Sequence, residues 1–407
     1  MSPTGLSCNL ANHGLQSSLI FCHVFPSLHS YGLCCSRDHG SLLSMAKRIL
    51  IVRLSAIGDS ILSVPVLTSL RRNFPTAEIG WVTERASAQL IQGHPALDQL
   101  FVTSKSTFKK PRDLWELGKQ LRQWKPDITL DLQGLTKSSL IAWLSGAKNR
   151  IGFHHGHFDG RELSTWFNNQ LFQADAEHIV DRGLELLGLL GVSDKRVEFN
   201  LPEMIQDTEF ADKVLQSIHF KSPFAIVNVG AGWPSKIWPS DRYASVAKHL
   251  GQLWGVPSLV VWSGEQERAA AEQVIGQSGG FAQLSPSTTL TQLRSLIRRS
   301  CLFIGSDTGP MHLSVAVGTP TVGMIGPMPI QRVRPYGANN VGIQKGRLPE
   351  SRLSDRKSDC VPMLSIQIED VILACDTIML RLDQARAKAA QLTDTSETAL
   401  IRSSCIQ

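Results

Sequence analysis

From residue 45 onward, short apolar runs alternate with longer segments whose apolar residues recur at helical spacing. The runs occupy residues 48–54, 78–83, 127–132, 149–153, 224–229, 258–263, 301–305 and 320–325. Apolar runs bounded by turn residues are typical of buried strands, and strands that alternate with helices form parallel sheets covered on both faces. The pattern therefore predicts an α/β protein built from doubly wound βαβ units.

The runs fall into two series, which predicts two doubly wound domains with a cleft between them. The break lies at residues 200–224, where an amphipathic segment leads into the second series. Ligands of open α/β sheets bind beyond the carboxyl ends of the strands, so we expect the site in the cleft. The predicted parts are an N-terminal extension (1–44), a first domain (45–203), a second domain (204–346), a polar connection and C-terminal helix (347–392), and a frayed tail (393–407).

The first 44 residues differ from the rest of the chain. They are rich in Ser, His, Cys and Gly and show no helical or strand period. They also lack the basic start and long apolar core of a signal peptide. We expect a disordered extension, or an upstream start codon with the true start at Met45; a targeting segment is the remaining alternative.

The eight cysteines show neither disulfide-like nor metal-ligand spacing. Four of them precede Met45 and the other four are scattered. No apolar run reaches the roughly 18 residues of a transmembrane helix. These features predict a reduced, cytoplasmic chain that is not integral to a membrane.

The charge balance is mildly basic. The 407 residues include 41 Lys and Arg against 35 Asp and Glu, a net charge of +6. This excess suits an anionic substrate, or peripheral contact with the inner face of the cytoplasmic membrane, better than nucleic acid, which usually meets a clustered basic stripe. The nearest approach to a stripe, residues 105–112, lies between strand-like segments and is typical of a solvated loop. We therefore predict no nucleic-acid partner.

The segment 301–312, CLFIGSDTGPMH, is the clearest candidate site. Its apolar run ends in Thr308-Gly309, which favour a turn, and the next residue is a proline, which suits a first helical turn. A helix amino terminus offers unpaired N–H groups to a phosphate. We predict ligand contacts from Asp307, Thr308, Gly309 and His312, although His312 alone is more typical of a core residue.

A second candidate is RLSAIGD, residues 53–59, which follows the first predicted strand. Gly58 would let the backbone approach a ligand closely, and Asp59 would then stand at the mouth of the cleft as a general base. The alternative is that Asp59 only caps the following helix. The segment is not GxGxxG, so it does not predict a dinucleotide site.

Two further strand ends carry glycine, lysine and acids. In GAGWPSKIWP, residues 230–239, Gly230 and Gly232 would turn backbone amides toward phosphate, and Lys236 would add a positive charge. In WSGEQE, residues 262–267, the final acid, Glu267, would accept hydrogen bonds from a ribose. The alternatives are an ordinary strand-to-helix turn and simple helix capping.

The sequence predicts no metal site and no cofactor. No D-x-D pair occurs, and no His or Cys cluster has ligand spacing. We expect lysine and helix dipoles to balance the charge of a diphosphate.

Taken together and in order, RLSAIGD, DLQGLTKS (131–138), GAGWPSKIWP, SGEQE and SDTGPMHLSVAVGTPTVGMIGP resemble the ADP-heptose:lipopolysaccharide heptosyltransferases of glycosyltransferase family 9. The resemblance implies a GT-B fold with two facing Rossmann-like domains, and a C-terminal helix that returns to the first domain. It implies Asp59 as catalytic base, Lys236 at the donor diphosphate, Glu267 by the donor nucleoside, and Asp307, Thr308, Gly309 and His312 around the sugar and diphosphate. It also implies Lys137, Arg161 and Arg182 on the acceptor side, where surface charge or an internal ion pair is the alternative.

The predicted function is inverting, metal-independent transfer of a heptose, or a related sugar, from an ADP-sugar to a lipopolysaccharide inner-core or other lipid-linked acceptor. Two alternatives stay open. One is a nucleotide-sugar epimerase or another glycosyltransferase on the same scaffold, and the other is a non-catalytic nucleotide-binding relative.

Overall fold

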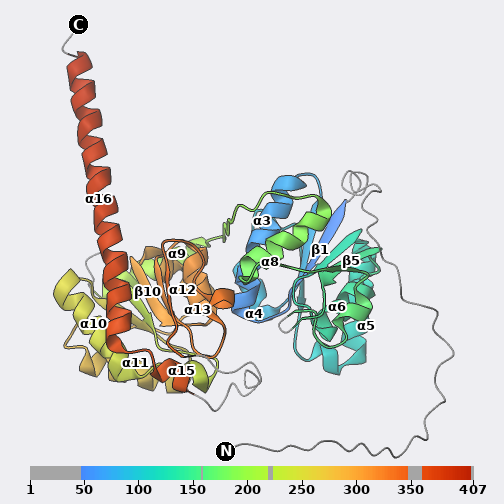
Figure 1. Ribbon diagram of the computed structural model, residues 1–407, viewed down its shortest axis with the longest axis horizontal. Helices are drawn as coiled ribbons and strands as arrows, with labels where there is room; N and C mark the ends of the chain where they lie inside the picture. Colours follow the sequence, from blue (N-terminus) through green and yellow to red (C-terminus); the bar gives the residue numbers. More distant parts are fainter. Residues whose placement is uncertain (1–46, 157–158, 219–222, 347–359, 405–407) are drawn as a thin grey trace, which may run out of the picture. The chain divides into compact units, whose positions relative to one another are not determined.

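The computed structural model describes residues 47–156, 159–218, 223–346 and 360–404, which form two parallel sheets of six strands each (Figure 1). The predicted extension, residues 1–44, lies outside the described residues, as does most of the polar connection after residue 346.

The first sheet has the strand order β3-β2-β1-β4-β5-β6 and is parallel throughout. Its strands are β1 (Arg48–Val52), β2 (Glu78–Glu84), β3 (Gln99–Thr103), β4 (Ile128–Asp131), β5 (Asn149–Phe153) and β6 (Gln170–Phe172). The helices around it are α2 (Ile57–Leu62), α3 (Val64–Asn73), α4 (Arg85–Ile91), α5 (Pro111–Trp124), α6 (Thr136–Leu144), α7 (Ser164–Phe167) and α8 (Ile179–Leu186), with short 3-10 turns η1 (Thr107–Lys109) and η2 (Leu187–Leu190).

The second sheet repeats this order, as β12-β11-β10-β7-β8-β9. Its strands are β7 (Ala225–Asn228), β8 (Ser258–Val261), β9 (Ala282–Leu284), β10 (Leu302–Ser306), β11 (Thr321–Met324) and β12 (Val341–Ile343). The helices are α9 (Ile205–Ser217), α10 (Ser240–Trp254), α11 (Gly264–Gln277), α12 (Leu290–Arg299), α13 (Gly309–Ala316), α14 (Ile330–Val333), α15 (Val361–Leu364) and α16 (Ile368–Ser404), with the 3-10 turn η3 (Pro234–Lys236). The predicted doubly wound α/β architecture is confirmed.

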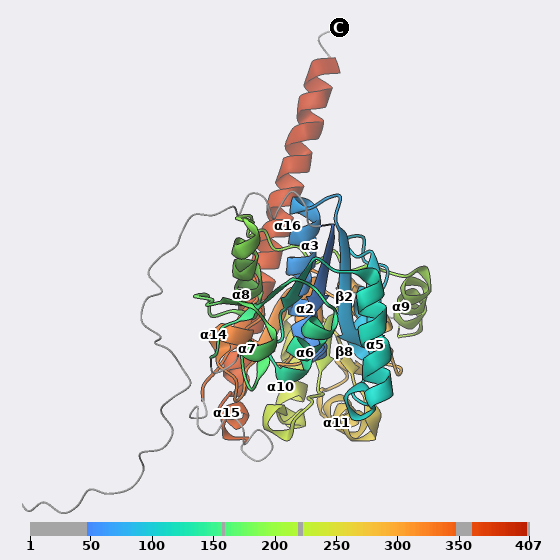
Figure 2. The ribbon, with the colours of Figure 1, turned by 90° about the vertical axis from the view of Figure 1, so that its right-hand side faces the viewer.

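The central strands are apolar on both faces because helices cover both faces (Figure 2). In β1, Ile49 and Ile51 belong to one buried cluster, while Leu50 and Val52 point into another on the opposite face. In β7, Ile226 alternates with its neighbours in the same way. Alternation with a period of two thus places the core on both sides of each sheet.

All eight predicted strands are present, and four further strands were missed. The missed strands are β3, β6, β9 and β12, which are the two edges of each sheet. Edge strands are short and half exposed, as in β6, where no residue is fully buried. They therefore lack the continuous apolar run that identifies a central strand.

The C-terminal helix differs from its prediction in two ways. It continues to Ser404, so residues 393–404, predicted as a frayed tail, are helical. It also packs against α10, β11 and β12 of the second sheet rather than returning to the first domain. Asp376 accepts hydrogen bonds there from His249 Nε2 (2.8 Å) and Trp254 Nε1 (2.7 Å). Buried Val371, Cys375 and Ile378 explain the packing, because they join the core of the second sheet.

Among the described residues, no helix combines the length and apolarity needed to cross a bilayer.

Candidate functional site

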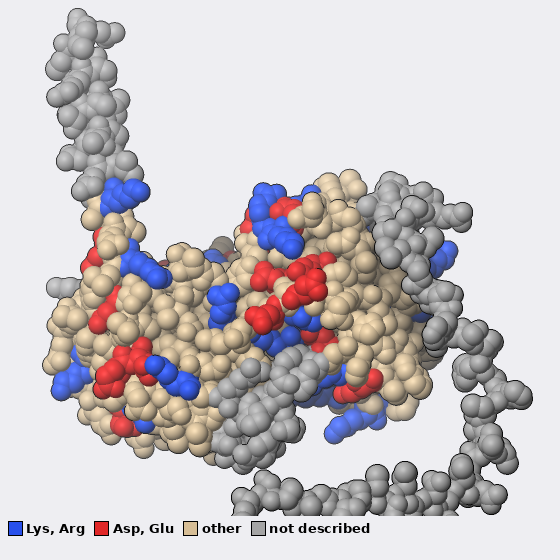
Figure 3. Space-filling model, in the orientation of Figure 1, with Lys and Arg blue, Asp and Glu red and all other residues tan. Residues whose placement is uncertain are grey.

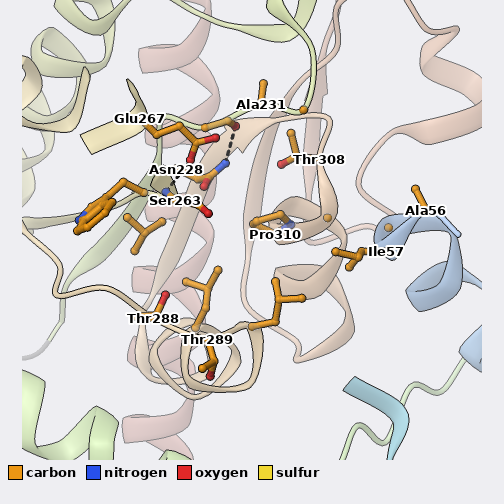
Figure 4. Close-up of a pocket in the computed structure, with 18 residues that line it drawn as sticks. Ala56, Ile57, Asn228, Ala231, Ser263, Glu267, Thr288, Thr289, Thr308 and Pro310 are labelled. Carbon is orange, nitrogen blue, oxygen red and sulfur yellow. Dashed lines mark hydrogen bonds between the residues drawn. The ribbon is translucent and has the colours of Figure 1, made fainter. Parts of the chain in front are cut away.

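A pocket of about 350 Å³ lies at the carboxyl edge of the second sheet, beside the start of α2 (Figure 4). This is where the strand order of the second sheet reverses, between β7 and β10, and where open α/β sheets bind their ligands. Its lining comes from the start of α2, the ends of β7 and β8, the loop before α12 and the start of α13: residues 56–58, 228, 230–232, 261–263, 267, 288–290, 293 and 308–310.

The loop after β7 and the first turn of α11 form one wall. Asn228 Nδ2 donates to the carbonyl of Gly230 (2.9 Å), and the backbone N–H of Ser263 donates to Glu267 Oε2 (2.7 Å) (Figure 4). Burial raises the pKa of the Glu267 carboxyl, although the Ser263 hydrogen bond opposes the rise. A Cβ added at Gly230 would stand 2.1 Å from Glu267 Oε2. Glycine is therefore needed there for the acid to occupy this wall.

Lys236, Asp307 and His312, none of which lines the pocket, form a largely buried polar triad. Lys236 Nζ donates to Asp307 Oδ2 (2.6 Å) and to the Asp307 carbonyl (2.9 Å), and His312 Nε2 lies 3.2 Å from Asp307 Oδ1. Burial alone would raise the pKa of Asp307, but the charge of Lys236, helped by His312, outweighs it and holds that pKa well below its usual range. Since an ionised carboxylate only accepts, His312 Nε2 carries the proton it donates.

The triad fixes the turn into α13. Thr308 is the N-cap residue of α13, and its hydroxyl donates to the Ser306 carbonyl (3.1 Å). Because the Thr308 side chain does not cap α13, the N–H of Gly309, the first residue of that helix and part of the pocket lining, has no side-chain cap; the next residue, Pro310, has no N–H. Lys236 also lies over the ring of Trp233, 4.7 Å from its centroid. The start of α13 thus offers a backbone dipole to an anionic ligand, and Lys236 is a neighbouring cation that does not itself line the pocket.

The start of α2 meets the start of α13 closely. A Cβ at Gly58 would stand 2.6 Å from His312 Cδ2, and one at Gly309 would stand 3.1 Å from Ile57 Cγ2. The glycine expected to allow close approach of a ligand thus allows close approach of the two domains.

Asp59 stands in the first turn of α2 and is held by one of its two oxygens. Arg53 Nη2 lies 2.9 Å from Asp59 Oδ2, and the Ala56 backbone N–H donates to the same oxygen (3.3 Å). The side chain is 35% exposed, whereas Arg53 is buried and its Nη1 donates to the Leu132 carbonyl. The capping contact that we considered as the alternative is therefore present. It leaves Oδ1 available for a proton.

The three acceptor-side candidates have different surroundings. Arg182 Nη2 lies 2.8 Å from Asp159 Oδ2, so the internal ion pair weighed as its alternative is present. Asp159 also binds Arg332 of α14 (2.9 Å), which ties the two domains together. Arg161 and Lys137 are half-buried, and Arg161 Nε is buried without a hydrogen-bond partner. None of the three candidates lines the pocket.

The structure sorts the predicted donor residues into two groups. Five line the pocket: Gly230, Gly232, Glu267, Thr308 and Gly309. Lys236, Asp307 and His312 do not line the pocket and bind one another, so their direct contact with a donor stays a prediction.

Sequence reasoning also missed contributors. Arg53 stood inside a quoted motif without being assigned a role. Thr288 and Thr289 line the pocket from the loop after the missed strand β9. Two consecutive threonines before a helix are a capping signal, and Thr289 does cap α12 by accepting from the Gln292 N–H (3.2 Å). Such a signal indicates where a helix starts and does not indicate a ligand.

Outside this site, the described residues form no second centre of one kind, either of charge on the face drawn in Figure 3 or of metal-binding residue types. On the face drawn in Figure 3, Lys and Arg alternate with Asp and Glu. Within the described part of the chain, no group of three or more His, Cys, Asp or Glu residues is placed to hold a metal ion.

Comparison with known proteins places the chain. The family model described as glycosyltransferase family 9 (heptosyltransferase) matches residues 114–361, more than half of the chain. Lipopolysaccharide heptosyltransferase 3 of Escherichia coli (strain K12) is 24% identical over 345 residues, covering 82% of this chain and 99% of the relative. Lipopolysaccharide heptosyltransferase 1 of Pseudomonas aeruginosa is 24% identical over 306 residues, covering 73% and 83%.

Solved structures agree. The crystal structure of a family 9 glycosyl transferase from Veillonella parvula DSM 2008 superimposes with a TM-score of 0.73 at 25% identity, covering 82% of this chain and 98% of that one. E. coli ADP-heptose lps heptosyltransferase II gives a TM-score of 0.64 at 18% identity, with 83% and 99% covered, and therefore supports the fold alone. The two sheets are accordingly the two halves of a GT-B fold, and the chain belongs to glycosyltransferase family 9, the heptosyltransferases.

Proposed function

We propose that this glycosyltransferase moves a heptose, or a closely related sugar, from an ADP-sugar to a lipopolysaccharide inner-core or other lipid-linked acceptor, with inversion and without a metal. The observation that carries the proposal is the pocket that gathers the Gly230–Gly232 loop, Glu267 and the start of α13 next to the start of α2. Family relatives are named lipopolysaccharide heptosyltransferases, and E. coli heptosyltransferase WaaC has been solved with ADP and with ADP-2-deoxy-2-fluoro heptose.

In the proposed reaction, an acceptor hydroxyl attacks the anomeric carbon of the donor sugar and loses its proton to Asp59 Oδ1. The new C–O bond forms as the bond from the anomeric carbon to the diphosphate oxygen breaks, and that oxygen keeps the electron pair. Attack opposite the leaving group inverts the anomeric carbon. Proton transfer to a placed carboxylate contributes about 10² to 10⁴ in rate.

The leaving diphosphate gains negative charge, which the second domain is suited to stabilise. Lys236 and the amides at the start of α13 supply positive charge and dipoles that are already oriented. Glu267, on the opposite wall, would accept hydrogen bonds from the ribose. The raised pKa of Glu267 does not prevent this, because hydrogen bonds donated by the ribose hydroxyls would stabilise the ionised form of this half-buried carboxyl.

A binding screen of ADP-, UDP- and GDP-sugars, followed by product analysis with and without a heptose-deficient lipopolysaccharide acceptor, tests the proposal. We expect ADP-sugars to bind most tightly and product to form only when acceptor is present. A preference for UDP- or GDP-sugars would overturn the heptose assignment. Conversion of the donor sugar in the absence of acceptor would instead indicate an epimerase.

A further inference from the structure

The exposed side of α5 carries three cations and a tryptophan in one row. Arg112, Trp115, Lys119 and Arg122 follow one another at spacings of three and four residues, which places them on one side of a helix. We call these four residues the α5 face. Trp115 is 58% exposed, and Lys119 Nζ lies 5.4 Å from the centroid of its ring. The α5 face thus combines a large, exposed aromatic side chain with positively charged side chains.

The cations of the α5 face differ from most arginines of this chain because they are unpaired. Arg72 binds Glu198 (2.9 Å), Arg298 binds Glu203 (2.8 Å), and other surface arginines are paired in the same way. Among the described residues, no acidic side chain lies within ion-pair distance of the three cations of the α5 face. Their charge is therefore available to an external partner.

This part of the chain also holds nearly all of the net charge. Residues 105–125 contain seven Lys and Arg and two Asp and Glu, a local charge of +5, while the whole chain carries +6. The remainder is close to neutral. Any attraction of the protein to an anionic surface should therefore be directed through α5 and the turn before it.

Two more exposed tryptophans lie on the adjoining helices. Trp143 on α6 is 48% exposed and Trp166 on α7 is 78% exposed. α5 packs on α6, and α6 packs on α7, where the rings of Trp143 and Phe167 meet at 6.2 Å. All three helices lie on the side of the first sheet turned toward the viewer in Figure 2. The exposed aromatic side chains and the unpaired cations belong to the same set of helices.

We propose that the α5 face, together with Trp143 and Trp166, docks this enzyme on an anionic lipid bilayer surface. Tryptophan favours the boundary between headgroups and acyl chains, and Lys and Arg are attracted to anionic headgroups. Three tryptophans distributed over three helices suit a broad, soft surface better than the stacked bases of a nucleic acid strand. The inference rests on the proposed function in one respect, since a lipid-linked acceptor would be presented at such a surface.

The test measures partition of the full chain onto vesicles of phosphatidylglycerol and phosphatidylcholine, with no donor or acceptor present. We expect binding to the anionic vesicles and little to phosphatidylcholine alone. The variant K119Q/R122Q should bind about 30-fold more weakly, since each cation near an anionic surface changes affinity by about fivefold. The matched control K213Q/K248Q removes the same charge from exposed positions of the second domain and should bind as the wild type does.

Salt separates the two parts of the interaction. The loss in K119Q/R122Q should shrink at high ionic strength, whereas the loss caused by Trp115→Ala should persist there. Equal weakening in K119Q/R122Q and K213Q/K248Q would overturn the proposal, as would binding that does not depend on lipid charge. Self-association that masks the α5 face, or salt-sensitive binding to a DNA duplex without vesicle binding, would also overturn it. Because the assay involves no turnover, failure here leaves the transfer reaction untouched, and failure of transfer leaves the vesicle result valid.

Discussion

The two halves of this enzyme share one topology but differ in the side chains at the carboxyl edges of their sheets. Both sheets have six parallel strands, and the two strand orders are equivalent. At the carboxyl edge of the first sheet the polar groups are long charged side chains bound to each other, such as Arg53 with Asp59 and Arg182 with Asp159. At the same edge of the second sheet the pocket lining includes glycines and threonines with a single acid, Glu267, and the Lys236–Asp307 ion pair is not part of that lining.

This difference shows that the topology determines where a ligand binds, whereas the size of the side chains determines whether the ligand contacts backbone or side-chain groups. Small residues bring the backbone to the ligand, which suits a diphosphate that accepts many hydrogen bonds. Long charged residues instead hold one reactive group in place. We therefore assign proton transfer to the first domain and charge stabilisation to the second, and this division can be tested residue by residue.

The largest expected effect is the loss of turnover in Asp59→Ala and Asp59→Asn. Without the Oδ1 carboxylate base, the transfer rate should fall by about 10² to 10⁴. ADP affinity, measured by calorimetry, should be unchanged, because Asp59 does not line the pocket. If Asp59 only caps α2, both variants would instead keep near-normal turnover, and Asp59→Ala would lose about 1 kcal/mol of stability.

The next effect concerns the junction between the domains, where His178 titrates. Its Nδ1 accepts from the Val180 N–H as the N-cap of α8, and its Nε2 lies 3.0 Å from the Arg334 carbonyl. Burial, opposed by that carbonyl, lowers the pKa of His178 from 6.5 to about 4. The unfolded chain takes up a proton below pH 6.5, whereas the folded chain resists protonation until about pH 4.

The free energy of unfolding should therefore fall by about 3 kcal/mol between pH 7 and pH 4 through this residue alone. Chemical denaturation across that range, compared with His178→Asn, measures it. Asn is also a good N-cap and does not titrate, so its curve should be flatter by that amount. Parallel curves for the two proteins would show that His178 has the same pKa in the folded and the unfolded chain, and would contradict the lowered pKa.

Lys236→Met should follow, with ADP binding weakened by about 10- to 100-fold, as expected when a hydrogen bond to a charged group is lost. Turnover should fall as well, because the same cation stabilises the leaving diphosphate. The pKa of Asp307 should rise, since burial would then be less opposed. Calorimetry with ADP and a pH profile of turnover measure both effects. Lys213→Met is the matched control, and unchanged ADP affinity in Lys236→Met would remove the lysine from the donor site.

The fold was predictable where the hydrophobic pattern is unambiguous. Central strands such as β1 and β10 are buried on both faces and appear in the sequence as continuous apolar runs. The edge strands β6 and β9 contain too few buried residues to stand out from the neighbouring loops. The packing of α16 on the second sheet could not be predicted from the sequence either. An apolar stripe indicates that one face of a helix is buried, but it does not identify the element against which that face packs.

The site was predictable at the level of loops rather than contacts. Turn chemistry located Gly230, Glu267 and Thr308, which line one pocket. It could not show that His312 would be buried against Gly58 from the other domain, because that contact joins residues 254 positions apart. Nor could it show that Arg53 holds Asp59, since an ion pair depends on side-chain direction as well as spacing.

The smallest effect, and the sharpest comparison, comes from two glycines that look alike in the sequence. Gly230 and Gly232 both belong to the loop after β7, and both line the pocket. A Cβ at Gly230 would meet Glu267 Oε2 at 2.1 Å, whereas a Cβ at Gly232 would meet nothing within 4 Å. Gly230→Ala should displace Glu267 and weaken ADP binding by about tenfold, within the range for overpacking a fitted site. Gly232→Ala, measured in the same calorimetric titration, should bind ADP as the wild type does. Equal losses in the two variants would mean that the loop binds through backbone freedom at both glycines; a loss only in Gly230→Ala would mean that the second domain recognises its donor through a wall whose shape is set by Glu267.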